Sequence, residues 1–155
     1  MPGRIEARLG EVGIELPKAG EVAGNYVPFV RSGDLLFIAG QLPVWMGERR
    51  FVGKLGREFS IEQGQQAARL CGLNLLAHVK HALGGDLDRI VRCVRLGGFV
   101  NSTEDFSEQP QVVNGCSNLM VEVFGDHGRH ARTAVGVNVL PFNLAVEVDG
   151  IFEVR

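Results

Sequence analysis

The chain has 155 residues, of which 45% are hydrophobic and 22% are charged, and its formal net charge at pH 7 is -2. A chain of this length is expected to fold as one domain, residues 1–155, and to bury roughly 68–70% of the surface that its unfolded form exposes. The basic residues are scattered and the isoelectric point is about 6.1, which argues against a clustered basic surface for nucleic acid.

The cysteines and the N-terminal residues bear on where the protein works. Cys71, Cys93 and Cys116 are odd in number and widely spaced, so neither a disulfide framework nor a C-x-x-C pair is expected. This usage is typical of a reducing compartment, and we expect a cytoplasmic protein with Cys71 and Cys116 packed as small hydrophobes. Residues 1–16 mix charges with isolated aliphatic side chains, and we expect neither a signal peptide nor a membrane anchor there.

The N-terminal part of the chain is expected to hold one short helix followed by a meander of strands. Ser32-Gly33-Asp34 has the composition of a tight hairpin turn, and residues 16–20 suit a connector. The expected bounds are residues 4–11 for the helix and residues 26–31, 35–39 and 50–52 for the strands.

Two longer helices and three more strands are expected in the remainder. Ser60 and Gln63 have the spacing of a capping box, and apolar residues then recur at steps of three and four until Gly84-Gly85 ends the helix. Pro110 suits the first turn of a second amphipathic helix, which runs to Gly125. The expected strands are residues 90–100, 133–139 and 144–154, and the last alternates between two faces.

This order of elements predicts an α+β fold in which two helices cover one face of a six-stranded mixed sheet. Strands 35–39 and 133–139 carry apolar or small residues on both faces. The sheet face opposite the helices then needs a cover, which another copy of the chain supplies most economically. The pattern therefore predicts a homo-oligomer.

One arginine lies at the start of an otherwise apolar, strand-like run, His130 to Val135, and Glu147 lies in the strand that follows. The guanidinium of Arg132 presents a planar fork of donors that suits the carboxylate of a small ligand. A second carboxylate nearby, that of Glu147, could accept or donate a proton. Arginine and glutamate are normally exposed, so the alternative is a pair of surface charges or a salt bridge.

Four segments of the chain carry a family-like pattern in order. They are Tyr26-Val27 after Gly24 (G-x-Y-V), Leu36 to Val44 (a strand ending in G-Q-x-P), Ala131 to Val135 (A-R-x-x-V), and Leu140-Pro141 followed by Glu147 in V-E-V-D. Each is weak alone, but in this order and spacing they resemble the YjgF/RidA family, the reactive-intermediate (imine) deaminases, also called L-PSP endoribonuclease-like proteins. The resemblance spans most of the chain.

The resemblance implies a chorismate-mutase-like fold of the bacillus type, in a homotrimer whose sheets form a central barrel. Small sites would lie in clefts between subunits. The implied reaction is hydrolysis of a 2-imino or enamino acid to a 2-keto acid and ammonia, without a metal or cofactor. Holding the substrate carboxylate would orient the imine, and a second carboxylate could accept a proton from the attacking water.

The resemblance also assigns roles to individual residues. Arg132 would clamp the substrate carboxylate and Glu147 would orient or activate water, as the catalytic pair. The implied substrate-binding residues are Tyr26 as a pocket wall, Asn114 as a polar neighbour, and the backbones of Gly40 and Ala134.

The chain departs from the family pattern in several places. Ala39 stands where typical deaminases carry serine, Ala134 where many carry cysteine, and His130 where proline or alanine is usual. An N-terminal extension at about residues 1–20 and a longer segment at residues 45–54 place the chain in a divergent branch.

Two other functions compete with deamination. A non-catalytic protein that binds or senses a small carboxylate could use the same cleft, and Ala39 and Ala134 favour it. Ribonuclease activity, which the older family label suggests, is less well supported, since neither the charge distribution nor a histidine pair of the ribonuclease kind points to it.

The histidines are expected to be structural or solvated. His78 and His81 lie three residues apart on the expected helix, but without a third ligand no metal site is expected. His127 and His130 could line the cleft, although solvated rings are the favoured interpretation.

Overall fold

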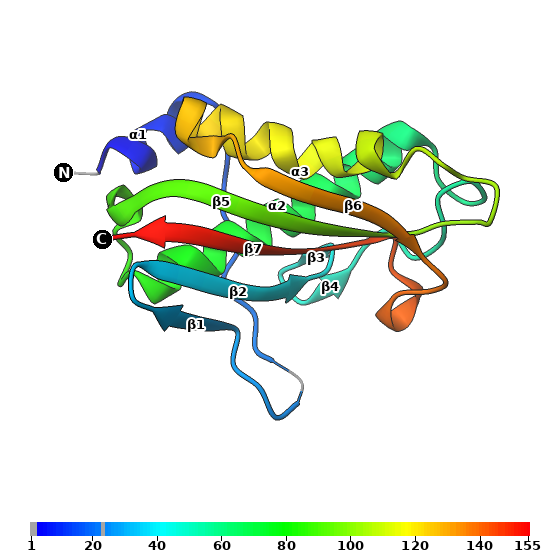
Figure 1. Cartoon of the computed structure of the whole chain (residues 1–155), viewed down its shortest axis with the longest axis horizontal. Coiled ribbons are helices and arrows are strands. Elements are labelled where there is room, and N and C mark those ends of the chain that lie inside the picture. The colour runs from blue at the N-terminus through cyan, green and yellow to red at the C-terminus, as the bar shows by residue number, and fades with distance from the viewer. Residues whose placement is uncertain (1–2, 23) are drawn as a thin grey trace.

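The computed structural model describes residues 3–22 and 24–155 (Figure 1). In chain order its helices and strands are α1 (Arg4–Glu11), β1 (Phe29–Ser32), β2 (Leu35–Gln41), β3 (Val44–Trp45), β4 (Glu48–Arg49), α2 (Ile61–Ala82), β5 (Ile90–Asn101), α3 (Gln109–Phe124), β6 (Ala131–Val137) and β7 (Val146–Val154). Short 3-10 turns precede the last three strands, namely η1 (Leu87–Arg89), η2 (Gly125–Gly128) and η3 (Pro141–Asn143). The α+β class is confirmed.

Within the described residues, the main sheet has five strands in the order β1-β2-β7-β5-β6, and β3 and β4 form a separate hairpin. Among these strand pairs only β5 and β6 run parallel, so the sheet is mixed, as predicted. The prediction of a sixth strand at residues 50–52 is wrong, because only Val52 makes an isolated bridge, to Leu144. Phe51 has a φ of 57°, a left-handed conformation that a strand does not contain.

The helices α2 and α3 pack together on one face of the sheet (Figure 1). α2 begins at the predicted capping box, in which Ser60 accepts from the Gln63 amide and Gln63 accepts from the Ser60 amide. Gly115 of α3 lies so close to α2 that an added Cβ would overlap the Gln65 carbonyl. The two helices therefore meet backbone to backbone at this point.

The core between helices and sheet contains all three cysteines. Cys71, Cys93 and Cys116 are free and buried, which confirms the packing predicted for the two that lie on helices. Burial raises the pKa of each thiol, so these side chains are unreactive at neutral pH.

The first helix, α1, is held to the rest of the molecule by apolar packing along one side and by hydrogen bonds at its N-terminus. Ile5 and Leu9 are buried, and α1 packs against the end of α3. The Asp88 carboxylate of η1 accepts hydrogen bonds from the backbone amides of Arg4 and Ile5, both at 2.8 Å. Asp88 thus caps a helix that lies far away in the sequence, where the local N-cap residue Gly3 offers no side chain.

The sheet face opposite the helices is uncovered in the single chain (Figure 1). Along β7, buried side chains alternate strictly with half-buried ones, as predicted, and the half-buried ones lie on this open face. Exposed apolar side chains accompany them on the neighbouring strands, namely Val30, Leu35, Phe37 and Val135. A large exposed apolar area of this kind is typical of an interaction surface.

Candidate functional site

Arg132 lies on the helix side of the edge strand β6, because it pairs in register with the buried Leu96 of β5. Its Nη1 donates to Asn114 Oδ1 at 2.7 Å and to Ser117 Oγ at 3.2 Å, and its Nη2 donates to the Pro110 carbonyl at 3.3 Å. All three acceptors belong to α3, which fixes the guanidinium. Of its five N–H donors, these bonds use three, and the two that remain are enough to hold a carboxylate.

Ser117 and His130 continue this hydrogen-bond chain. Ser117 Oγ lies 2.8 Å from His130 Nε2, and His130 Nδ1 lies 2.6 Å from the Gly128 carbonyl oxygen. Because a carbonyl only accepts, Nδ1 carries the proton and Nε2 accepts from the Ser117 hydroxyl. The chain is thus directed from Arg132 through Ser117 to His130.

The imidazole of His130 is neutral at pH 7 in this setting. Burial lowers its pKa, and the Arg132 charge lowers it further, against the opposite effect of the Gly128 carbonyl. The expectation of a solvated ring is wrong for this histidine, which is half-buried and bonded at both nitrogens. His130 therefore supports the arginine through Ser117.

Glu147 lies on the opposite, open face of the sheet, in register with Phe99 of β5. Burial raises the pKa of its half-buried carboxyl group, and the neighbouring Asp149 raises it further. Asp149 is itself ion-paired with Arg95 at 3.8 Å, whereas Glu147 has no ion pair among the described residues. A carboxylate with a raised pKa is a better proton acceptor near neutral pH.

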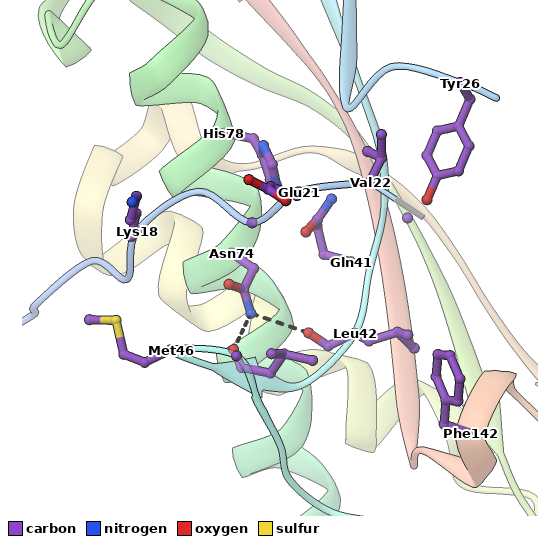
Figure 2. A pocket seen from close by; sticks show the side chains of 14 residues that line it. Lys18, Glu21, Val22, Tyr26, Gln41, Leu42, Met46, Asn74, His78 and Phe142 are labelled. Carbon is purple, nitrogen blue, oxygen red and sulfur yellow. Dashed lines mark hydrogen bonds between the residues drawn. The ribbon is translucent and has the colours of Figure 1, made fainter. Parts of the chain in front are cut away.

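Gly40 lies against this carboxylate at an irregularity in β2. The register of β2 on β7 shifts between Ile38 and Gln41, and a Cβ added at Gly40 would lie 2.8 Å from Glu147 Oε2. A glycine here therefore leaves room for the carboxylate. Gly40 and Tyr26 also line a cavity of about 310 Å³ within the single chain (Figure 2).

The six site residues predicted from the sequence fall into two halves. The arginine half, on the helix side of β6, consists of Arg132, Asn114 and Ala134. The carboxylate half, at the irregular part of β2, consists of Tyr26, Gly40 and Glu147. The halves lie on opposite faces of the sheet, so a single chain does not bring Arg132 and Glu147 together.

The alternative of a salt bridge between Arg132 and Glu147 of the same chain is wrong. Neither Arg132 nor Glu147 occurs in an ion pair of the described residues. Both are partly buried rather than ordinary surface charges. Each is instead held in a defined local environment on its own side of the sheet.

Sequence reasoning missed the contribution of Ser117. Its signal was available, because Ser117 follows Asn114 by three residues and side chains at that helical spacing share a face.

Within residues 3–22 and 24–155, no group of three or more histidine, cysteine or acidic side chains could hold a metal ion. No helix in the same ranges has the length and apolar character that crossing a membrane requires.

Comparison with known proteins gives matches over nearly the whole chain. Residues 6–153 match the family described as "YjgF/chorismate_mutase-like, putative endoribonuclease". The chain is 48% identical over 154 residues to protein TCP17 of Trypanosoma cruzi, a match that covers 99% of this chain and 96% of that protein.

Two solved structures share both sequence and fold. Protein Atu1372 of Agrobacterium tumefaciens, of unknown function, is 50% identical with a TM-score of 0.91, over 97% of this chain and 92% of that one. A "putative endoribonuclease" from Shewanella oneidensis MR-1 is 36% identical with a TM-score of 0.94, over 98% of this chain and 100% of that one. The chain therefore belongs to the YjgF/RidA family.

Proposed function

We propose that this protein hydrolyses 2-imino and enamino acids to 2-keto acids and ammonia, in a cleft formed between copies of the chain. The observation that carries the proposal is the separation of the two halves. An anchored guanidinium and a carboxylate with a raised pKa lie on opposite faces of the sheet. They become one site only when the arginine half of one copy meets the carboxylate half of another.

Each half supplies one part of the reaction. Arg132 binds the substrate carboxylate and so fixes the position of the C=N carbon. Water attacks that carbon while Glu147 accepts a proton from the water. Glu147 passes this proton to the imine nitrogen, which gives a neutral carbinolamine. The hydroxyl proton is then transferred to the amino group, the C–N bond breaks, and ammonia and the keto group are formed. Tyr26 walls the pocket, and the backbones of Gly40 and Ala134 supply polar contacts.

The assembly that we propose is a homotrimer whose sheets pack into a central barrel. The uncovered sheet face with its exposed apolar side chains supports it, because burying that face against other copies removes apolar surface from water. The cytoplasm is the proposed location, and no cofactor is needed for the steps above.

The test combines two variants, Arg132→Ala and Glu147→Gln, in one assembly by co-expression. An amino-acid oxidase generates imino acids in place, and keto-acid formation is followed. Each variant alone is expected to be no faster than buffer. With random assembly of equal amounts, about a quarter of the sites combine both intact side chains from different copies, and activity returns to about that fraction.

A matched control pairs Arg132→Ala with Asn114→Ala, which lies in the same half. Arg132 and Asn114 come from the same copy, so no site in that mixture contains both of them intact, and the pair is expected to gain nothing over the separate variants. Absence of recovery in the first mixture would contradict the shared cleft. A wild-type protein no faster than buffer with every imino acid would contradict the deaminase function.

A second candidate function is non-catalytic binding of a small carboxylate in the same cleft. Ala39 and Ala134 favour it, because they provide no hydroxyl or thiol where typical deaminases carry one. A carboxylate that raises the melting temperature of wild type but not of Arg132→Ala, without turnover of any imino acid, would support this function.

The description of relatives as endoribonucleases suggests a third activity. Cleavage of RNA requires a cationic surface and usually an acid–base pair, whereas His130 has both ring nitrogens engaged by Ser117 and Gly128. We therefore do not favour ribonuclease activity.

A further inference from the structure

A cavity of about 310 Å³ opens beside the carboxylate half (Figure 2). It lies between the segment 18–22, the end of β2, the β3–β4 hairpin and α2. Much of its wall is apolar, from Leu42, Val44, Met46 and Phe142, and its charged members are Lys18 and Glu21 of the N-terminal segment. Its volume is at the lower end of the roughly 300–1,000 Å³ found for small-molecule sites, which suits one ring or a long aliphatic group.

One ring nitrogen in this wall has no hydrogen-bond partner among residues 3–22 and 24–155. It is the Nδ1 of His78, a side chain only 4% exposed, and this atom neither accepts nor donates a hydrogen bond in the described part of the chain. Leaving a buried ring nitrogen unpaired costs free energy, and an apolar side chain at this position of α2 would avoid the cost. A histidine here is explained if a ligand group bonds to it.

The neighbouring Asn74 shows the contrast. It lies one helical turn earlier on the same face of α2, and its amide nitrogen donates to the carbonyls of Leu42, Val44 and Leu70. The bonds to Leu42 and Val44, which Figure 2 draws, hold the loop that forms the cavity wall, whereas the bond to Leu70 lies within α2. The amide nitrogen of Asn74 thus uses its hydrogen bonds within the protein, whereas Nδ1 of His78 has no partner among the described residues and is free to bond to a ligand.

The state of His78 limits the kind of group it can bind. Burial lowers its pKa, and the nearby His81 lowers it further, so the ring is neutral at pH 7. A neutral imidazole pairs with a hydroxyl or an amide as donor or acceptor and offers no charge to an acid.

Gly40 connects the cavity to the proposed site. It lines the cavity together with Tyr26, and the Glu147 carboxylate packs directly on it. A substrate whose reacting carbon lies at Glu147 can therefore extend its side chain past Gly40 into the cavity.

We infer that this cavity binds the side chain of the substrate and that His78 hydrogen-bonds a neutral polar group near its end. The inference rests on the proposed function. It names the substrate class as 2-imino acids with a large, mostly apolar side chain that ends in a hydroxyl or amide group. Imino acids with short side chains would leave the cavity empty and His78 unpaired.

The test compares imino acids generated from tyrosine, phenylalanine and alanine, the first two differing by one hydroxyl. Wild type is expected to have the highest kcat/KM with the tyrosine-derived imine and the lowest with the alanine-derived one. In His78→Leu the ratio of tyrosine- to phenylalanine-derived kcat/KM should fall about two- to tenfold, the effect of one neutral hydrogen bond. Its melting temperature should stay equal or rise, because an unpaired polar group is removed.

Two further variants keep the test specific. His127→Leu changes the same residue type at an exposed position outside this cavity, and should leave the ratio unchanged. Leu42→Phe narrows the cavity and should lower kcat/KM for both aromatic imines while sparing the alanine-derived one. A ratio in His78→Leu equal to that of wild type would overturn the inference.

A binding measurement separates this inference from the proposed function. Propanoate, 3-phenylpropanoate and 3-(4-hydroxyphenyl)propanoate cannot react, and their affinities are measured by calorimetry with wild type and His78→Leu. If wild type prefers the hydroxylated acid and His78→Leu does not, the result supports binding of the substrate side chain in this cavity, even if no imine is turned over. If the three acids bind with equal affinity, or if none binds, the inference that this cavity holds the substrate side chain is overturned, whatever the catalytic result.

Discussion

At the scale of single residues, the two charged side chains of the proposed site, Arg132 and Glu147, lie in contrasting environments. Arg132 is surrounded by acceptors on α3, so its position is fixed before any ligand arrives. Glu147 has few partners and lies beside another carboxylate, Asp149. The first arrangement favours binding of an anion, and the second favours uptake of a proton.

The raised pKa of Glu147 predicts how activity depends on pH. Glu147 accepts a proton only when ionised, so kcat/KM should fall as pH drops through a pKa above the usual glutamate value. Glu147→Gln should remove this decline at low pH together with most of the activity. Glu153→Gln, on the same face of β7, should keep the activity and its decline at low pH. The measurement is a pH profile of keto-acid formation, and an acid limb at the ordinary glutamate pKa would contradict the assignment.

The same shift predicts an effect on stability. A carboxyl group whose pKa is higher in the folded state makes folding less favourable as pH rises through the interval between the unfolded and folded pKa. At neutral pH, Glu147→Gln should therefore unfold at the same temperature as wild type or a higher one. The residue would then be retained for chemistry at a cost in stability.

At the scale of elements, local signals predicted the long helices well. The capping box at Ser60 and the glycine pair after α2 act within a few residues, so the sequence contains them in full. The short strands were harder to predict. The β3–β4 turn places Met46 and Gly47 at positive φ, and Met-Gly lacks the usual signal of an Asn-Gly turn.

The attachment of α1 gives a prediction for this scale. Asp88→Ala removes the acceptor of the Arg4 and Ile5 amides and should cost about 1 kcal/mol, as loss of a helix cap does. Those backbone hydrogen bonds lower the pKa of Asp88, so the stabilisation is present above its unfolded pKa and lost as pH falls. Chemical denaturation at pH 7 measures the change.

A matched control for that measurement is Asp126→Ala, which removes an exposed ion pair with Arg129 at 3.4 Å. Exposed pairs contribute little, so the control should be near wild type. Faster hydrogen exchange in residues 4–11 of Asp88→Ala alone would locate the effect in α1, and equal exchange in both variants would refute the capping role.

At the scale of the whole molecule, the sequence indicated candidate residues for the proposed site but not how they are distributed over the sheet. Alternation along β7 placed Glu147 on one face. The face of Arg132 depends on the parallel register that pairs it with Leu96, and that register is set by packing between distant segments. For the same reason Ser117 and His130, on different elements, were not recognised as partners.

The open sheet face predicts the behaviour of the assembly. Phe37 is 40% exposed on that face, and Phe37→Glu places a charge where the proposed trimer buries apolar surface. Light scattering should give a trimeric mass for wild type and a monomeric mass for the variant, with an unchanged circular dichroism spectrum and no deaminase activity. A monomeric wild type with full activity would contradict the shared cleft.

The backbone contact between α2 and α3 has a consequence for mutational tolerance. Gly115 lies against Gln65 and is adjacent to Asn114, the residue that orients Arg132. Any side chain at this position would push α3 outward and carry the arginine's acceptors with it. Position 115 should therefore tolerate substitution as poorly as the residues of the proposed site, and a survey of damaging variants would find it among them although Gly115 lies between α2 and α3.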